Sequence, residues 1–242
     1  FWQGPVHPAK PSRNVRGAAF MQTRASAHRY RLYGRLTTGS AASEAALAET
    51  GARHTLLDVP GDRTAAAAGG YLAINPRGQV PALVLPDGTV LTEGAAILLH
   101  LADAFPEARL APPPGTAARA THDRWLFFFH ANVYEGELRR YYPDRYTTDP
   151  AGAEGVRAAA EDYVKRHYLL FDRARTEAGL ADAPFALGPR RTALDLYLWM
   201  LIQWIDRAWM TAHAARLLAV ADAVAALPAV APVHARHFAA IP

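Results

Sequence analysis

The stretch NPRGQVPALVLPDGTVLTEGAAILLHLAD, residues 75–103, decides the fold of this chain. It contains two short apolar runs, residues 82–85 and residues 89–91, which are separated only by Pro-Asp-Gly. Proline, aspartate and glycine favour tight turns, and the flanking runs have the length and composition of short strands. The stretch therefore predicts a β-hairpin.

A helix and a proline frame this hairpin. Apolar residues recur at helical spacing over residues 95–102, and Thr92 is placed to cap the helix that they predict. Val80-Pro81 stands immediately before the first strand. Because proline has no N–H to donate to a sheet, this pair marks a strand start or a fixed turn, with a cis bond as one option.

As one block, residues 75–103 resemble the glutathione-binding half of the glutathione transferases, which is a thioredoxin-like fold. In that family a cis-proline after valine precedes the third strand, and Val80-Pro81 matches it here. A Glu-Ser pair then opens the third helix and holds the γ-glutamyl end of glutathione; the matching residues are Glu93 and Gly94. Glycine for serine removes one hydroxyl, although the amides of a helix N-terminus attract a carboxylate by themselves.

The resemblance covers about residues 30–242 and implies two domains. Strands are expected at residues 30–33 and 53–59, and a helix at residues 40–50 that ends at Gly51. The fold class is thus α+β: a thioredoxin-like N-terminal domain followed by an all-α helical bundle domain. The expected divisions are a disordered basic extension, the glutathione-binding domain, a linker with three consecutive prolines and the helical domain, at residues 1–29, 30–106, 107–116 and 117–242.

Two features organise the helical domain. A first long helix is expected over residues 117–142, and its segment 125–129 is apolar on all sides, as in a central helix of a bundle. Thr192 and Asp195 form a capping box at the start of a later helix. The glutathione transferases carry an equivalent box at a buried helix, so the resemblance extends there.

The positive charge of the chain is concentrated at its beginning. Residues 1–43 hold seven Lys and Arg and no Asp or Glu, whereas the whole chain has a net charge of +4. Residues 44–242 are therefore net negative. No aromatic-interleaved basic patch accompanies the extension, so a nucleic-acid partner is not expected. Met21 within the extension is an alternative start.

Composition excludes several classes of chemistry. The chain has no cysteine, so it has no disulfide, no thiolate metal site and no cysteine nucleophile. No apolar run reaches the roughly 18 residues of a membrane helix, and a cytoplasmic location without a membrane partner is expected. His234 and His237 are three residues apart but lack a third ligand, so they are interpreted as decorating the last helix and no metal is expected.

Conjugation chemistry in this family requires a thiolate of glutathione. A thiol titrates near ~8.5, and a hydroxyl hydrogen bond of roughly 1.5–3 kcal/mol plus a helix N-terminus of about 0.3–1 kcal/mol makes thiolate abundant at neutral pH. An ungapped comparison with beta-class transferases places their cysteine at Gly39. Ser40 and Thr38 are the expected catalytic hydroxyls, with Thr37, Tyr33 or backbone amides alone as alternatives. The missing cysteine argues against thiol–disulfide exchange.

The resemblance also implies the binding residues. Val80, before Pro81, would pair its backbone with the cysteinyl unit of glutathione, and Gln79 would reach the glycyl end. Glu93 and the Gly94 amide would hold the γ-glutamyl group. The second substrate is expected beside Phe127 and Tyr134, which share a face of the first long helix. Tyr134 could donate a hydrogen bond to a leaving group or an epoxide oxygen, or it could simply pack between the domains.

The sequence thus predicts a glutathione transferase that joins the glutathione thiolate, as co-substrate, to a small apolar electrophile. A homodimer is implied by the resemblance alone. Two other functions stay open: a non-catalytic module that binds glutathione or apolar ligands, and a glutathione-dependent isomerase or lyase on the same scaffold.

Overall fold

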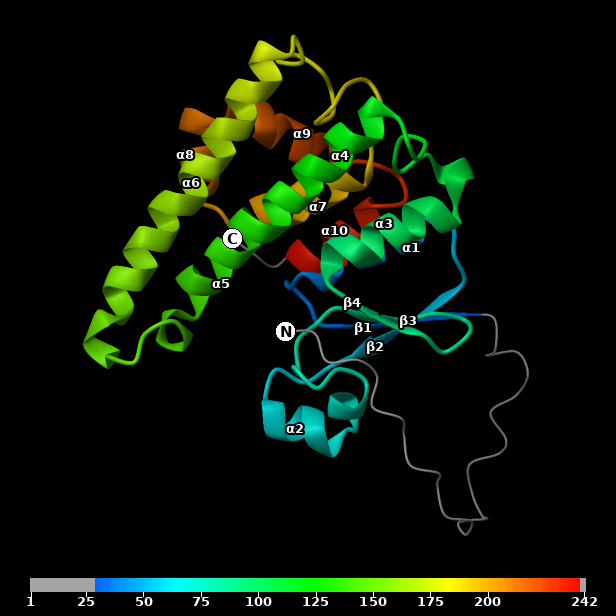
Figure 1. Cartoon of the computed structure of the whole chain (residues 1–242), viewed down its shortest axis with the longest axis vertical. Helices are drawn as coiled ribbons and strands as arrows, with labels where there is room; N and C mark the ends of the chain where they lie inside the picture. Colours follow the sequence, from blue (N-terminus) through cyan, green and yellow to red (C-terminus); the bar gives the residue numbers. More distant parts are fainter. Residues whose placement is uncertain (1–28, 240–242) are drawn as a thin grey trace.

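The computed structural model describes residues 29–239, so the expected extension falls outside the described residues except for Arg29. One four-stranded sheet has α1 and α3 on one face and α2 on the other, and the later helices gather beyond α1 and α3 (Figure 1). This is the predicted thioredoxin-like domain followed by a helical domain. The elements of the first domain are β1 (Tyr30–Gly34), α1 (Ser40–Thr50), β2 (His54–Asp58), α2 (Arg63–Ala68), η2 (Tyr71–Ala73), β3 (Ala82–Val84), β4 (Val90–Thr92) and α3 (Gly94–Ala104).

The sheet confirms the predicted hairpin. Its strand order is β2-β1-β3-β4, with β1 parallel to β2 and antiparallel to β3. In the hairpin Leu83 lies opposite Leu91, and Gly88 turns the chain with a φ of 94°. The Val80–Pro81 peptide bond directly before β3 is cis. The proline therefore sits at the strand start, where its missing N–H costs the sheet no hydrogen bond.

The two helices on the sheet begin in different ways. α1 has the predicted bounds and ends at Gly51, whose φ of 65° lies in the left-handed region. The predicted cap of α3 is wrong, because Thr92 belongs to β4 and Glu93 precedes the helix with a φ of 64°. A left-handed Glu93 turns the strand directly into the helix, and its side chain caps nothing. Such a backbone costs of order 1–3 kcal/mol and clusters at functional sites.

The second domain follows a short turn and consists of helices. Its elements are η3 (Pro106–Ala108), α4 (Ala117–Phe128), η4 (Phe129–Tyr134), α5 (Glu135–Tyr141), η5 (Pro143–Arg145), η6 (Pro150–Gly152), α6 (Ala153–Glu177), α7 (Ala193–Ile202), α8 (Arg207–His213), α9 (Ala215–Ala225) and α10 (Ala231–Phe238). η4 is a π-helical segment that joins α4 to α5. None of the helices within residues 29–239 is both long and apolar enough to cross a membrane.

The central helix of the bundle is α7 rather than the first long helix. All ten residues of α7 are buried, whereas Phe127 in α4 has 48% of its surface exposed. An apolar run marks burial only where neighbouring elements cover every side, and α4 leaves one side uncovered. The predicted capping box at the start of α7 is confirmed: the Asp195 carboxylate accepts from the Thr192 N–H at 2.7 Å and from its hydroxyl at 2.9 Å.

Candidate functional site

The loop before α1 is held by hydroxyl hydrogen bonds. Ser40 Oγ donates to the carbonyl of Arg35 at 2.8 Å and accepts from the Arg35 N–H at 3.1 Å. Thr38 Oγ1 donates to the same carbonyl at 2.7 Å and lies 3.0 Å from Ser40 Oγ. Each hydroxyl has one hydrogen, so both hydrogens are used inside the loop. The two predicted catalytic hydroxyls therefore brace the loop in this conformation.

Ser40 faces the protein interior. It is 1% exposed, and a Cβ built on Gly34 would lie 2.7 Å from its Cβ. The space lined by Ser40, Glu44 and His237 measures only about 10 Å³, which leaves no room for a tripeptide. The N-cap residue of α1 is Gly39, which has no side chain to cap the helix. The N–H groups of Ser40 and Ala41 point to Thr38, at 3.4 Å from its Oγ1 and 3.1 Å from its carbonyl oxygen. The positive end of the α1 dipole is therefore the feature of this end that favours an anion.

The C-terminal helix α10 contacts the loop before α1 and the first turns of α1. His237 Nδ1 accepts from the Thr37 N–H at 3.2 Å, and His237 Nε2 lies 2.9 Å from Glu44 Oε2. Arg236 also contacts Glu44, at 2.7 Å, and Trp204 Nε1 donates to the Thr37 carbonyl at 3.2 Å. The interpretation of His237 as decoration is wrong, since it is buried and joins α10 to α1. Thr37, with a φ of 59°, is thus fixed on both sides.

Glu44 gives this contact a pH dependence. Burial alone would raise the pKa of Glu44, but the hydrogen bonds and charges of His237 and Arg236 outweigh it and lower the pKa below its ordinary value. Stability from ionised Glu44 is therefore present above a pH of about 4.5 and is lost as pH falls through the folded value. We expect Glu44→Gln to cost roughly 1–3 kcal/mol at neutral pH and to flatten the acid limb, measured by urea unfolding from pH 3 to 7. An unchanged acid limb would contradict this.

The loop before β3 presents a free backbone edge. Tyr71 Oη donates to the Gln79 carbonyl at 2.5 Å, and Asn75 Nδ2 donates to the same oxygen at 2.8 Å. These bonds hold the loop in place ahead of Pro81. Among the hydrogen bonds within residues 29–239, none uses the N–H or C=O of Val80. An unpaired backbone N–H and C=O beside a fixed turn can pair with an extended peptide.

Glu93 is the centre of a polar cluster at the start of α3. Its carboxylate contacts Arg77 at 2.9 Å and His130 Nε2 at 3.3 Å. His130 Nδ1 lies 2.8 Å from Tyr197 Oη, and a Cβ on Gly94 would lie 3.3 Å from the Tyr197 ring. The Tyr197 ring thus covers the position where the family pattern has serine. With its side chain half exposed, Glu93 is accessible to a ligand.

Tyr134 connects this cluster to α1. Its ring stacks on Tyr197 with centroids 6.2 Å apart and lies 5.7 Å from Trp204. A Cβ built on Gly39 would lie only 2.6 Å from Tyr134 Oη. Burial, with a contribution from the charge of Glu93, raises the pKa of Tyr134 to about 12. The phenol therefore keeps its proton at every ordinary pH and is available as a hydrogen-bond donor.

The structure does not bring Phe127 to this cluster. Phe127 was predicted to share a face with Tyr134 on one regular α-helix. Tyr134 is the last residue of the π-helical η4, which winds more residues into each turn, so the spacing of a regular α-helix does not hold between the two residues. Phe127 is instead exposed at the surface. His130 and Tyr134 do lie together, with ring centroids 5.9 Å apart.

Sequence reasoning missed three members of the site: Arg77, His130 and Tyr197. His130 and Tyr134 are four residues apart, a spacing that could have indicated a shared polar face. Tyr197 comes two residues after the capping-box aspartate, but no local pattern tells that its ring covers Gly94. No sequence pattern marks Arg77 as a site residue apart from its position shortly before the cis-proline. Residues 29–239 contain no group of three metal-ligating side chains arranged around one point.

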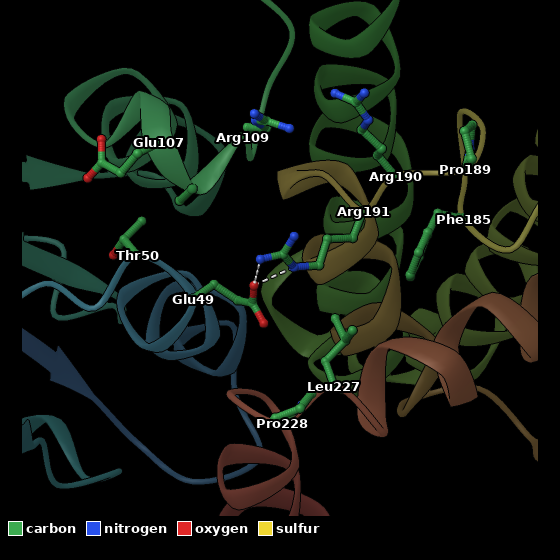
Figure 2. Close-up of a pocket in the computed structure, with 11 residues that line it drawn as sticks. Glu49, Thr50, Glu107, Arg109, Phe185, Pro189, Arg190, Arg191, Leu227 and Pro228 are labelled. Carbon is green, nitrogen blue, oxygen red and sulfur yellow. Dashed lines mark hydrogen bonds and ion pairs between the residues drawn. The ribbon is translucent and has the colours of Figure 1, made fainter.

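A separate cavity of about 760 Å³ lies at the opposite end of α1. It is lined by Glu49 and Thr50 from that end and by arginines that include Arg109, Arg190 and Arg191 (Figure 2). Arg191 is paired with Glu49 across its floor. Since this cavity is at the C-terminal end of α1, it is not formed by Glu93, Val80 or Tyr134. The candidate site is the N-terminal end of α1 with the starts of β3 and α3.

Comparison with known proteins shows which family this chain resembles. Residues 43–104 match the family model of the glutathione S-transferase N-terminal domain. Glutathione S-transferase GstA of Escherichia coli O157:H7 is 35% identical over 166 residues, which cover 68% of this chain and 77% of that protein. The uncharacterized GST-like protein YncG of Escherichia coli K12 is 33% identical over 200 residues, covering 82% of this chain and 93% of that protein.

The structure is also similar to solved structures. A sphingomonad glutathione S-transferase complexed with glutathione superposes with a TM-score of 0.66 at 30% sequence identity. The match covers 84% of this chain and 96% of that one. The likeness extends over both the sheet domain and the helical domain.

Proposed function

Because this chain belongs to the glutathione S-transferase family, we propose that it binds glutathione at the N-terminal end of α1 and transfers the thiolate to a small apolar electrophile. The observation that carries the proposal is the convergence of three features: the N-terminal end of α1 with its helix dipole, the unpaired backbone of Val80 and the half-exposed carboxylate of Glu93. Together they match a peptide that has a thiolate, a peptide backbone and an ammonium.

Each part of glutathione has a partner of suitable chemistry. The γ-glutamyl ammonium pairs with Glu93, and the carboxylate beside it meets the Gly94 amide at the start of α3. The cysteinyl unit pairs with the N–H and C=O of Val80 as a short strand. The exposed side chain of Gln79 reaches the glycyl end. The sulfur then faces the N-terminal end of α1, whose helix dipole favours its ionised form.

The reaction needs only the bound tripeptide and the electrophile. The thiol gives its proton to solvent, and the sulfur lone pair forms a bond to an electrophilic carbon. In a substitution the leaving group departs with the bonding electron pair; in an addition the new carbanion or alkoxide takes a proton from water. The walls beside the sulfur are the rings of Tyr134, Tyr197 and Trp204, which suit an apolar substrate.

A calorimetric titration with glutathione, followed by a conjugation assay with a chlorinated nitroarene, tests the proposal. We expect saturable binding and a conjugation rate above the uncatalysed rate. Saturable binding without added rate would instead indicate the binding module. Turnover of an isomerisable substrate without net consumption of glutathione would indicate the isomerase. Failure to bind glutathione at millimolar concentration would overturn the proposal.

We also propose a homodimer located in the cytoplasm, which the family suggests. Light scattering of the purified chain should give twice the mass of one chain, and a monomer mass at micromolar concentration would contradict the dimer.

A further inference from the structure

We propose that the hydroxyl of Tyr134 donates the hydrogen bond that holds the glutathione sulfur as a thiolate. Position 39 is glycine because any side chain there would displace this hydroxyl. The proposal rests on the proposed binding of glutathione. It assigns the activating donor to the helical domain rather than to Ser40 or Thr38 in the sheet domain.

The contact between Gly39 and Tyr134 carries the argument. A Cβ on Gly39 would lie 2.6 Å from Tyr134 Oη and 2.9 Å from Cε2. Real side chains do not approach so closely, so any other residue at position 39 would push the ring away. The backbone of Gly39, with a φ of −55° and a ψ of −13°, is one that every residue adopts. The glycine at position 39 is therefore explained by the close approach of Tyr134 and not by the backbone conformation.

Tyr134 has a free hydrogen where the other hydroxyls do not. Ser40 and Thr38 both donate to the carbonyl of Arg35. Within residues 29–239 no hydrogen bond involves Tyr134 Oη, and this oxygen is not among the fully buried polar atoms that lack a partner, so it is open to a ligand. A hydroxyl donor without a protein partner that lies against Gly39, the N-cap residue of α1, is placed to bind an anion there.

The surroundings hold this donor in position and keep it protonated. Tyr197 stacks on one side of the ring and Trp204 packs against it, while the π-helical η4 sets where the ring leaves the helix. The ionisable groups that act on the phenol are Glu93, Glu135, Tyr142 and Arg77. Burial and the charge of Glu93 raise the pKa of Tyr134 to about 12, so the thiol and not the phenol ionises.

The line of contacts also places the hydroxyl near the sulfur. Gly94 lies against both Tyr197 and Pro81, since a Cβ there would be 3.3 Å from the Tyr197 ring and 4.0 Å from Pro81 Cγ. Tyr197 stacks on Tyr134, which in turn meets Gly39. Tyr197 and Tyr134 therefore form a wall from the cis-proline to α1. A cysteinyl unit paired with Val80 has its sulfur at the α1 end of that wall.

The proton balance of this step is simple. Binding releases the thiol proton to solvent, and the sulfur accepts a hydrogen bond from Tyr134 Oη without taking the proton. Tyr134→Phe removes one oxygen and leaves the ring packing intact. Because a hydrogen bond to a charged group is worth roughly one to two pKa units, the pKa of the bound thiol should rise by about that amount. At a pH below that pKa, the fraction of bound glutathione that is ionised should fall about 10- to 100-fold in the same variant.

The experiment follows thiolate absorbance of bound glutathione against pH in the unaltered chain and in five variants. Tyr134→Phe is expected to raise the pKa of the bound thiol, and Gly39→Ala is expected to raise it too by displacing the hydroxyl. In the double variant the rise in the pKa of the bound thiol should be much smaller than the sum of the two single rises, because both changes remove the same interaction. Tyr30→Phe, at the far end of β1, is the matched control, and Ser40→Ala tests the rival donor.

The outcomes separate this proposal from the proposed function. If Tyr134→Phe binds glutathione with an unchanged thiol pKa, the proposal fails while transferase function stands. A pKa that rises in Ser40→Ala and not in Tyr134→Phe also overturns it. A fall in the conjugation rate without a change of pKa would assign Tyr134 to the electrophile and contradict the proposal. If the unaltered chain binds no glutathione, the proposed function itself fails.

Discussion

Glu93→Gln is expected to weaken glutathione binding roughly 10- to 100-fold, the factor that corresponds to losing one charge-assisted hydrogen bond. Glutamine keeps the shape of the side chain but cannot neutralise the γ-glutamyl ammonium. The ion pair of Glu93 with Arg77 is exposed, so its loss should change stability by less than about 1 kcal/mol. Calorimetric titration gives the affinity and urea unfolding gives the stability.

A matched control exists for this substitution. Glu107→Gln changes the same kind of residue at the opposite end of α1, where Glu107 is exposed beside the separate cavity (Figure 2). It should leave glutathione affinity unchanged. Equal affinity in Glu93→Gln and the unaltered chain would remove Glu93 from the binding site.

Asp195→Ala is expected to lower the free energy of unfolding by about 3–5 kcal/mol, because it leaves three buried donors without their acceptor at roughly 1–3 kcal/mol each. The fully buried Asp195 accepts from the N–H and the hydroxyl of Thr192 and from the N–H of Ala186, the last at 2.6 Å. Arg175, also buried, is attracted by its charge. The substitution orphans these donors at the start of the central helix α7. Urea unfolding at neutral pH measures the loss.

Asp206→Ala provides the comparison. Asp206 also caps a helix, α8, and accepts from the Ala208 N–H at 2.7 Å, but it is exposed. Water replaces the lost acceptor there, so the expected cost is about 1 kcal/mol. Similar losses in the two variants would mean that burial adds nothing to the Asp195 capping box.

The parts of the fold that were predicted correctly depend on local chemistry. The hairpin follows from a Pro-Asp-Gly turn between two apolar runs, and α1 ends where Gly51 supplies a left-handed residue. The start of α3 was missed because Glu93 adopts a backbone that glutamate rarely takes. No residue pattern announces such a conformation, since the surrounding structure imposes it.

The site was predicted less well than the fold because its contacts join distant segments. Glu93, Val80 and Pro81 lie in one block that a family pattern can match. The commitment of the Ser40 hydroxyl to Arg35 depends on how the loop folds back. The position of Tyr134 opposite Gly39 depends on the packing of two domains. Residue types in the sequence show which hydroxyls exist, but only the packing shows which of them has a free hydrogen.

The central claim is that the N-terminal end of α1 holds the sulfur of glutathione as a thiolate. Its most direct test is the pKa of the thiol when glutathione is bound to the unaltered chain, read from thiolate absorbance as pH is varied. The claim predicts a value at least about one unit below that of free glutathione under the same conditions, since the helix dipole and a hydroxyl donor both stabilise the anion. A bound thiol with the same pKa as the thiol of free glutathione would contradict the claim.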